Sequence, residues 1–545
     1  MKRWLTPILL LLILCVALFV RVYKLDDFPV GFHNDEVYVA YNSWSLLETG
    51  KDASGHFLPI VINQWGDYRP AGYHYFAALS YLLFGLSDWA TRLPGAVFGA
   101  ISVILLWLVV DLLWGRKTAW IAAVILAILP WHIMISRATS ESVMSLSFVL
   151  VGVYGAARVY KRHAAPLWYI TTCLGFVASF LSYHAARYAV PIFFVGLAGL
   201  FWIWRQKRLA ILTFILSIIL GVFSILLLST GGNARASQIS IFSFPETKLV
   251  LDESIREDGV QNVLFTRLWH NKAVAYFTVA VGNGLRHMGS NFLAYGEFLP
   301  ARYVAGSETL LPLWMYGFYL LGYAVIIAGV FTKKQKESLV FLWASVVALI
   351  PAALTVEDIP NVQRASIFIV LVVIAISIGI HTLFEALRGN ARKIVVVVFI
   401  IVAVYSSGQF FHEYFVHGFV HRPWYRNNGE KDLVLTLNKY AKAGERAVVT
   451  ASSENDEMYY VWYLRIPPHT AQTIPPGQRL RTLFPTFTYL PRDCVFDKST
   501  WAPHTIYVST GSCKDIPGTT IEKRILKEDG STAFTIFRSG ATYPR

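Results

Sequence analysis

The N-terminal region of the chain contains the apolar run LTPILLLLILCVALFV at residues 5–20. Lys2 and Arg3 precede this run, and the basic sequence Arg21-Val22-Tyr23-Lys24 follows it, where a signal peptide would carry small residues and a cleavage site. The run is long enough to cross the hydrocarbon core of a bilayer. We therefore expect an uncleaved first transmembrane helix with a cytoplasmic N-terminus.

The composition extends this interpretation to the whole chain. Hydrophobic residues make up 55% of the 545 residues and charged residues only 15%, against roughly a quarter in soluble proteins. The net charge of +14 comes from short basic clusters between apolar runs, which is the pattern of cytoplasmic loops. A soluble enzyme and a nucleic-acid-binding protein are thereby excluded, and the fold class is a polytopic α-helical membrane protein.

Ten further apolar segments are candidate spans, which makes about eleven in all. They are 91–113, 118–136, 142–160, 167–183, 188–204, 209–229, 312–332, 338–355, 366–384 and 394–412. The run 72–85 is too short to span, and counting it would place later basic clusters outside, so we expect an interfacial segment there.

An odd number of spans places three long segments on the extracytoplasmic side: 24–90, 230–311 and 413–545. We expect a transmembrane domain at 1–412, with 24–90 and 230–311 as its first and large outer loops, and a soluble domain at 413–545.

The C-terminal region resembles a small α/β domain. Residues 447–450 and 505–508 have strand character, and Asp529-Gly530 separates two further candidate strands as a hairpin turn. Cys494 and Cys513 could form a disulfide if the domain is extracytoplasmic, whereas Cys15 and Cys173 lie in apolar runs.

The first outer loop opens with Phe32-His33-Asn34-Asp35-Glu36-Val37-Tyr38. Apolar residues then recur at helical spacing, which predicts an amphipathic helix at the membrane surface. Asn34 or Asp35 could simply be its N-cap, with Glu36 favourable for the helix dipole. Alternatively, a carboxylate here could take a proton from an acceptor hydroxyl, or the two acids could help to hold a divalent cation.

Further motifs complete a recognisable order along the chain. The same loop contains Gly66-Asp67-Tyr68-Arg69-Pro70-Ala71-Gly72-Tyr73-His74-Tyr75, then a short apolar segment ending in Phe84-Gly85, then Trp89-Ala90-Thr91-Arg92-Leu93-Pro94. A first span, an Asp-Glu pair and these motifs in this order resemble the family 39 type of GT-C membrane glycosyltransferases, which includes protein O-mannosyltransferases and aminoarabinose transferases. The resemblance is most specific over residues 1–190.

This resemblance implies a GT-C fold, a polyprenyl-phosphate-linked sugar donor and a catalytic aspartate in the first outer loop, which corresponds to Asp35. Glu36 corresponds to the neighbouring acidic residue, and the expected catalytic residues are Asp35 and Glu36. Tyr38 and Val39 stand where the aminoarabinose transferases have Arg and Tyr, so the acceptor stays open.

Polar residues elsewhere on the outer side are candidates for binding the donor phosphate, although arginine near a span end can also simply contact lipid headgroups. The resemblance places Glu141 near the site, where it could instead be a helix cap or pair with Arg137. The expected substrate-binding residues are Arg69, Tyr73, His74, Glu141, His184, Arg187, Arg302 and Arg364, and the expected ligands of a divalent metal, if one is used, are Asp35 and Glu141.

The predicted function is that of an inverting glycosyltransferase with Asp35 as general base. The expected partners are the lipid-linked donor, the bilayer and an extracytoplasmic acceptor that is a glycan, a lipid or a protein, with no nucleic acid. The short basic N-terminus favours the plasma (inner) membrane of a bacterium. A lipid or sugar transporter or flippase and a membrane-anchored scaffold or sensor are the alternatives, but the predicted spans carry almost no acidic residues of the kind a transport pathway uses.

Overall fold

The computed structural model describes residues 2–64, 67–161, 165–229, 238–259, 262–297, 299, 309–332, 335–418, 428–450, 457–490, 494–495 and 501–538, with side chains from residue 5 onward. The chain forms two compact units. Unit 1 contains residues 1–23, 60–72 and 95–411, and unit 2 contains residues 24–59, 73–94 and 412–545. The predicted transmembrane domain included all of the first outer loop, whereas most of that loop lies in unit 2.

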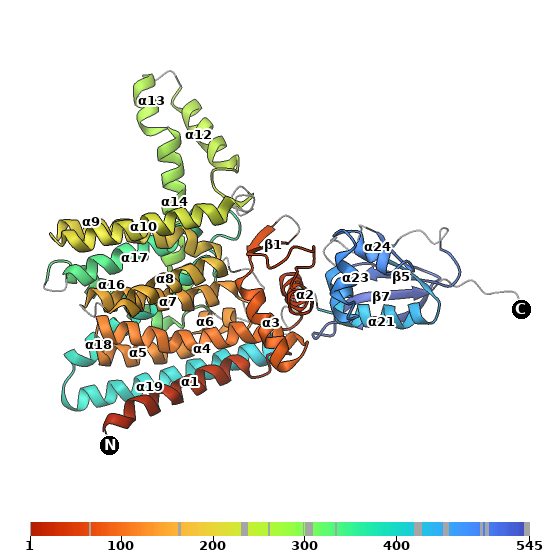
Figure 1. Ribbon diagram of the computed structural model, residues 1–545, viewed down its shortest axis with the longest axis horizontal. Helices are drawn as coiled ribbons and strands as arrows, with labels where there is room; N and C mark the ends of the chain where they lie inside the picture. Colours follow the sequence, from red (N-terminus) through yellow and green to blue (C-terminus); the bar gives the residue numbers. More distant parts are fainter. Residues whose placement is uncertain are drawn as a thin grey trace, which may run out of the picture. The chain divides into compact units, whose positions relative to one another are not determined.

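Unit 1 is a bundle of apolar helices (Figure 1). Among the described residues, eight helices are long and apolar enough to cross a membrane, a bent pair forms a further candidate, and two apolar helices are shorter. In chain order, the helices at the eleven predicted spans are α1 (Lys2–Val22), α4 (Asp88–Leu113), α5 (Arg116–Ile128) with α6 (Pro130–Ser136), α7 (Glu141–Tyr160), α8 (Pro166–Ser182), α9 (His184–Ile203), α10 (Lys207–Leu227), α16 (Leu313–Gly329), α17 (Gln335–Ala353), α18 (Ser366–Ala386) and α19 (Gly389–His412).

The third predicted span is bent by 55° between α5 and α6. Pro130 has no N–H group, so the carbonyls at the end of α5 need other donors. The buried guanidinium of Arg21 supplies them, because it donates to the carbonyl oxygens of Leu126 and Ala127 at 3.2 Å. It also donates to His132 Nδ1 at 2.8 Å. A buried cation on α1 therefore stabilises the break.

Small residues let α7 and α8 approach closely. A Cβ atom at Gly155 would lie 2.6 Å from Thr172 Oγ1, and one at Gly152 would lie 2.8 Å from the ring of Phe176. Helices in membranes associate largely through such close packing, because lipid tails are as apolar as the side chains. Close contact here fixes the two helices whose outer ends carry Glu141 and Ser182.

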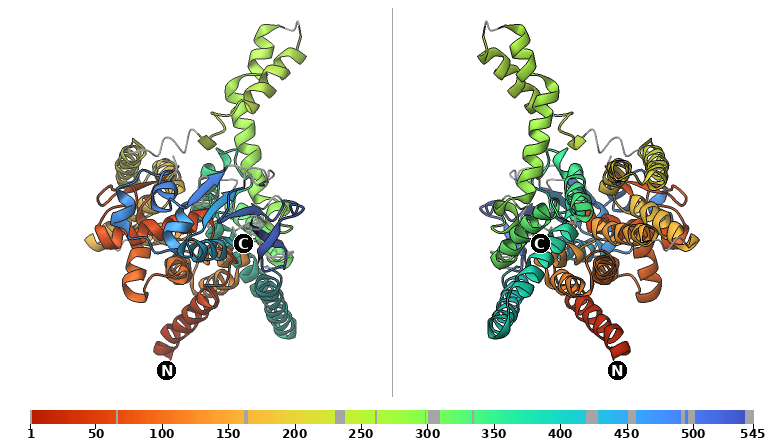
Figure 2. Two further views of the ribbon diagram at one scale, coloured as in Figure 1. Left: turned by 90° about the vertical axis from the view of Figure 1, so that its right-hand side faces the viewer. Right: turned by 90° about the vertical axis from the view of Figure 1, so that its left-hand side faces the viewer.

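The large outer loop is mostly helical where the structure describes it. It contains α12 (Glu246–Glu257), α13 (Val263–Trp269), α14 (Lys272–Met288) and α15 (Ser290–Leu293). The first three of these helices extend away from the other helices of unit 1 (Figures 1 and 2). Residues 61–64 and 67–70 of the first loop form an antiparallel pair, β1 (Val61–Gln64) and β2 (Asp67–Pro70), which also belongs to unit 1.

Unit 2 contains α2 (Asn34–Thr49), α3 (Gly72–Phe84) and the predicted α/β domain. Its sheet has the order β4-β3-β5-β7-β6, in which β3 is parallel to β4 and β5 while β7 is antiparallel to β5 and β6. The strands are β3 (Arg446–Thr450), β4 (Phe487–Leu490), β5 (Thr505–Thr510), β6 (Thr520–Leu526) and β7 (Thr532–Arg538), and the helices are α21 (Glu430–Lys442), α22 (Glu457–Tyr463), α23 (Pro468–Gln472) and α24 (Arg479–Leu483).

One sequence expectation, the disulfide, is met in unit 2. Cys494 and Cys513 form a disulfide with their Cα atoms 5.6 Å apart. The run expected to be interfacial forms α3, which is only 13 residues long and exposes Leu79, Leu82 and Leu83 by half or more of their surface. A helix of this length is too short to cross a bilayer, and its position along the membrane surface stays a prediction.

Candidate active site

The acidic pair lies in the first turn of α2, as the sequence indicates, but the N-cap is His33 rather than Asn34 or Asp35. His33 Nδ1 accepts a hydrogen bond from the backbone N–H of Asp35 at 3.2 Å, and Glu36 accepts one from the backbone N–H of His33 at 3.1 Å. This is a capping box with histidine in the place of serine or threonine. The cap prediction was wrong because an imidazole nitrogen can serve as the acceptor in place of a side-chain oxygen.

Glu36 forms a buried ion pair with Arg92. Arg92 donates to the two carboxylate oxygens through Nε at 2.9 Å and Nη2 at 3.0 Å, and both side chains are almost fully buried. The same guanidinium donates to the carbonyl oxygens of Leu25 and Gly31 at 3.0 and 2.6 Å. Both oxygens of Glu36 are engaged in this pair, which links the loop to α4, and its predicted catalytic role stays a prediction.

Asp35 has a different environment. Its side chain is 41% exposed, whereas that of Glu36 is 3% exposed. His33 Nδ1 lies 3.7 Å from its carboxylate, but that nitrogen already accepts the N–H of Asp35 and so carries no proton in this arrangement. The loop thus holds one carboxylate in an ion pair and presents the neighbouring one to solvent.

Residues of the C-terminal region brace the loop. The Tyr459 hydroxyl donates to the Phe32 carbonyl oxygen at 2.6 Å and lies 2.9 Å from Asn34 Oδ1. The side-chain amide of Gln472 lies 2.8 Å from the hydroxyl oxygens of both Ser45 and Thr49. The α/β domain therefore shapes the loop that carries Asp35, a role that sequence analysis did not assign to it.

Tyr73 and His74 are both buried within unit 2. The Tyr73 hydroxyl donates to the carbonyl oxygen of Thr91 at 3.1 Å, so it joins α3 to the first turn of α4. Substrate binding by these two residues stays a prediction.

Unit 1 gathers four of the predicted residues into a second polar cluster: Arg69, Glu141, His184 and Arg187. His184 Nε2 donates to the carbonyl oxygen of Tyr68 at 2.8 Å, and His184 Nδ1 accepts from Arg187 Nη1 at 3.3 Å. Since one ring nitrogen donates and the other accepts, His184 is held in its neutral form. Arg69 on the adjacent β2 pairs with Asp67 at 2.9 Å.

Arg187 is the most distinctive member of this cluster. Its side chain is buried, and Nε donates to the carbonyl oxygen of Phe180 at 2.9 Å. Its Nη2 atom is buried without a hydrogen-bond partner among the described residues. An unpaired guanidinium nitrogen is costly to bury, and anion binding by Arg187 stays a prediction.

Glu141 lies at the first position of α7, and its N-cap is Ser140, whose hydroxyl accepts from Val143 N–H at 3.4 Å. Glu141 is buried and interacts electrostatically with Arg187. Arg137, the pairing partner considered from sequence, instead donates to the carbonyl oxygens of Val20, Arg21 and Tyr23 at the end of α1.

Arg364 and its surroundings form a separate group in unit 1. Arg364 Nη2 donates to Glu357 at 2.8 Å. Nearby, Asn361 N–H donates to His287 Nε2 at 2.9 Å, and burial lowers the pKa of His287 to about 4. Arg302 lies outside the described residues.

In the described part of the chain, no cluster of three or more His, Cys, Asp or Glu side chains could hold a metal ion. The predicted metal site therefore stays a prediction. Asp35 and Glu141 also belong to different compact units.

Four residues in these clusters went unassigned in the sequence analysis: His33, Asp67, Arg92 and Tyr459. The motif Trp89-x-x-Arg92-Leu93-Pro94 was the available signal for Arg92, since its order suggested a resemblance without giving a role. His33 and Asp67 have partners two or three residues away, whereas the partners of Tyr459 follow from tertiary structure alone.

Comparisons with known proteins define the class. Residues 68–230 match the family described as dolichyl-phosphate-mannose-protein mannosyltransferase. This match confirms the predicted resemblance to GT-C glycosyltransferases of the family 39 type, and it includes every predicted substrate-binding residue that forms the second cluster. Asp35 precedes the matched range.

A relative from Bacillus subtilis agrees with this class. "Putative mannosyltransferase YkcB" of Bacillus subtilis (strain 168) is 23% identical over 263 residues, which cover 47% of this chain and 35% of YkcB. The chain therefore spans about a third of the length of that relative.

The solved structures show the same fold. ArnT from Cupriavidus metallidurans bound to undecaprenyl phosphate has a TM-score of 0.51 at 13% identity, covering 98% of this chain and 99% of ArnT. Archaeal oligosaccharyltransferase AglB from Archaeoglobus fulgidus, in complex with an inhibitory peptide and a dolichol-phosphate, has a TM-score of 0.54 at 11% identity, covering 85% and 64% of the two chains. Another structure of the Archaeoglobus enzyme is a complex with Zn and sulfate. The chain is an integral membrane protein of GT-C fold.

Proposed function

We propose that the protein is a glycosyltransferase that moves one sugar from a polyprenyl-phosphate carrier to an extracytoplasmic acceptor. The observation that supports this proposal is the difference between the two neighbouring acids. Glu36 forms a buried ion pair with Arg92, whereas the Asp35 side chain is 41% exposed. The ligands named for ArnT and AglB, undecaprenyl phosphate and dolichol-phosphate, support a lipid-linked donor.

In the proposed reaction, the Asp35 carboxylate accepts the proton of an acceptor hydroxyl. The hydroxyl oxygen forms a bond to the anomeric carbon while the bond from that carbon to the carrier phosphate breaks, with inversion. The phosphate leaves with the bonding electron pair as an anion, so no carboxylic acid has to protonate it. A single solvent-accessible carboxylate is sufficient for this chemistry.

The donor phosphate would bind to the second cluster. Arg187 offers a buried guanidinium nitrogen, Nη2, that has no partner among the described residues, and Arg69 adds a second positive charge in the same unit. Charge-assisted hydrogen bonds to phosphate strengthen as negative charge develops on the leaving group. Neutral His184 orients Arg187 without adding charge.

The proposed orientation places the N-terminus in the cytoplasm and the α/β domain outside. Basic residues lie at the ends of helices that face the same side of the membrane in the proposed topology: Arg116, Lys161, Lys207 and Lys336. The positive-inside rule assigns that side to the cytoplasm. The disulfide of Cys494 and Cys513 suits an oxidising compartment. Residence in the plasma membrane of a bacterium and a divalent cation at Asp35 and Glu141 stay predictions.

The decisive experiment is mass spectrometry of lipid carriers in cells with and without this chain. A glycosyltransferase consumes its donor, so cells lacking it should accumulate one polyprenyl-phosphate sugar and lose one sugar from an envelope component. The purified protein in vesicles should then release free polyprenyl phosphate from that donor. Translocation of the intact donor without its cleavage would establish the flippase alternative instead.

A further inference from the structure

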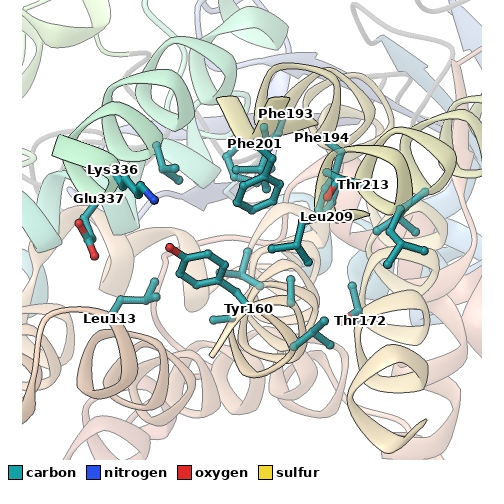
Figure 3. Close-up of a pocket in the computed structure, with 18 of the residues that line it drawn as sticks. Leu113, Tyr160, Thr172, Phe193, Phe194, Phe201, Leu209, Thr213, Lys336 and Glu337 are labelled. Carbon is teal, nitrogen blue, oxygen red and sulfur yellow. The ribbon is translucent and has the colours of Figure 1, made fainter. Parts of the chain in front are cut away.

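A mostly apolar cavity of about 260 Å³ lies between the membrane helices of unit 1 (Figure 3). Side chains of α4, α7, α8, α9, α10 and α17 form its walls. Phe193, Phe194 and Phe201 of α9 line it beside Leu209 and Thr213 of α10. Its charged groups are Lys336 and Glu337, and hydroxyl groups come from Tyr160, Tyr169, Thr172 and Thr213.

This cavity is distinct from the proposed active site. Helix α7 has Glu141 at its first position and Tyr160 at its last, so these two residues are about 28 Å apart at 1.5 Å per residue. On helix α9 the lining residues run from Phe193, about 9 Å along the axis from Arg187, to Phe201, about 21 Å from it. The cavity therefore extends from the middle of these helices to the ends that carry the basic clusters.

The polar groups combine opposite charges. Lys336 and Glu337 are adjacent in the first turn of α17, and both are half-buried. Lys336 Nζ lies 5.4 Å from the centre of the Trp204 ring, and the Glu337 carboxylate interacts electrostatically with Tyr160. One cation and one anion thus flank a chamber whose other walls are almost entirely apolar.

We propose that this cavity binds a membrane phospholipid with a phosphoethanolamine headgroup. One acyl chain fills the chamber, the phosphate contacts Lys336, and the primary ammonium contacts Glu337. Lipid tails and cavity walls are equally apolar, so the acyl chain gains little by leaving the bilayer and selectivity must come from the headgroup. An ammonium group with three N–H donors can hydrogen-bond a carboxylate, whereas a trimethylammonium group cannot.

Native mass spectrometry of the full-length protein tests this proposal with three lipids of identical acyl chains and different headgroups: phosphoethanolamine, phosphocholine and phosphoglycerol. We expect the protein to retain the first lipid about tenfold better than the other two, as one charge-assisted hydrogen bond predicts. Equal retention of the three lipids would overturn the proposal. Displacement of the bound lipid by polyprenyl phosphate would also overturn it, because the cavity would then serve the donor.

Two kinds of variant locate the binding. Glu337→Gln should remove the preference for phosphoethanolamine over phosphocholine, while Lys393→Gln, an exposed cation at the start of α19, should leave it unchanged. Ala156→Trp, in the cavity wall, should lower retention of all three lipids, while Ile219→Trp on an exposed face of α10 should not. An unchanged preference in Glu337→Gln would contradict the proposal even if Ala156→Trp fails to fold.

Discussion

Arg92 and Glu36 are 56 residues apart in the chain and form a two-point ion pair with nearly complete burial of both side chains. The fork of the guanidinium matches the two carboxylate oxygens, and its other N–H groups reach the carbonyl oxygens of Leu25 and Gly31. A buried pair of this kind is a weak source of net stability but a strong determinant of geometry. It fixes the loop that presents Asp35.

Removing one partner of this pair should be costly. Glu36→Gln and Arg92→Gln each leave the other group without its charge partner in a buried place, which typically destabilises by about 3–5 kcal/mol. Thermal unfolding and limited proteolysis of the purified variants would measure the loss. The control is Arg116→Gln, which breaks the more exposed pair with Asp111 and should cost no more than about 1 kcal/mol. A Glu36→Gln protein as stable as wild type would refute the structural role.

The membrane helices could be predicted from sequence because the apolar composition of each segment is visible without knowledge of the rest of the fold. An apolar run long enough for a bilayer is visible locally, and all eleven predicted spans coincide with helices. The break at Pro130 was missed because apolar residues continue on both sides, and the donor that stabilises it, Arg21, comes from another helix. The helices α12, α13 and α14 were missed because their mixed composition gives no such signal.

The candidate site shows the same limit. Sequence order identified the acidic pair and the residues Arg69, His184 and Arg187, because these stand in short motifs. Arg92 pairs with Glu36 and not with Asp35, and it lies 56 residues further along the chain than Glu36. No local sequence pattern reveals that contact. The brace from Tyr459 comes from a different domain in the linear sequence and was equally invisible.

Asp35→Asn separates catalysis from structure. Asp35 is not the N-cap and lies one residue before the locked Glu36, so an amide of similar size should leave α2 intact. An amide cannot accept the proton of the acceptor hydroxyl, and loss of a general base typically lowers the rate about a hundred- to ten-thousand-fold. Single-turnover transfer by a protein with wild-type melting temperature is the measurement. Near-normal transfer would move the search for the base to Glu141.

Arg187 should act on the donor. Arg187→Lys keeps the charge but loses the planar fork, so kcat/KM for the lipid-linked donor should fall partly, while Arg187→Gln should lower it about ten- to a hundredfold through loss of a charge-assisted contact. Varying the donor concentration at saturating acceptor measures this. Because Nε also bonds the Phe180 carbonyl, melting temperatures must accompany the kinetics. If both variants fold and the donor KM and kcat/KM stay at wild-type values, Arg187 is a structural residue.

His287 predicts a pH dependence of stability in unit 1. Its Nδ1 donates to the carbonyl oxygen of Asn283 at 2.7 Å and its Nε2 accepts from Asn361 N–H at 2.9 Å, so the folded state holds the neutral ring. Burial lowers the pKa of His287 to about 4, below the ordinary value near 6.5 expected in the unfolded chain. Between these two values the unfolded state binds more protons than the folded state, and stability therefore falls as the pH falls.

The loss should begin near pH 6.5, amount to about 3 kcal/mol by pH 4 and level off below it, at about 1.4 kcal/mol per pH unit. His287→Gln does not titrate, so the difference in unfolding free energy between wild type and this variant should shrink across that window and stay constant above pH 7. His469→Gln, at an exposed histidine, is the matched control for a His-to-Gln substitution that leaves His287 in place. Chemical unfolding in detergent from pH 4 to pH 8 provides the comparison, and parallel curves for His287→Gln and wild type would show that the ring does not titrate as argued.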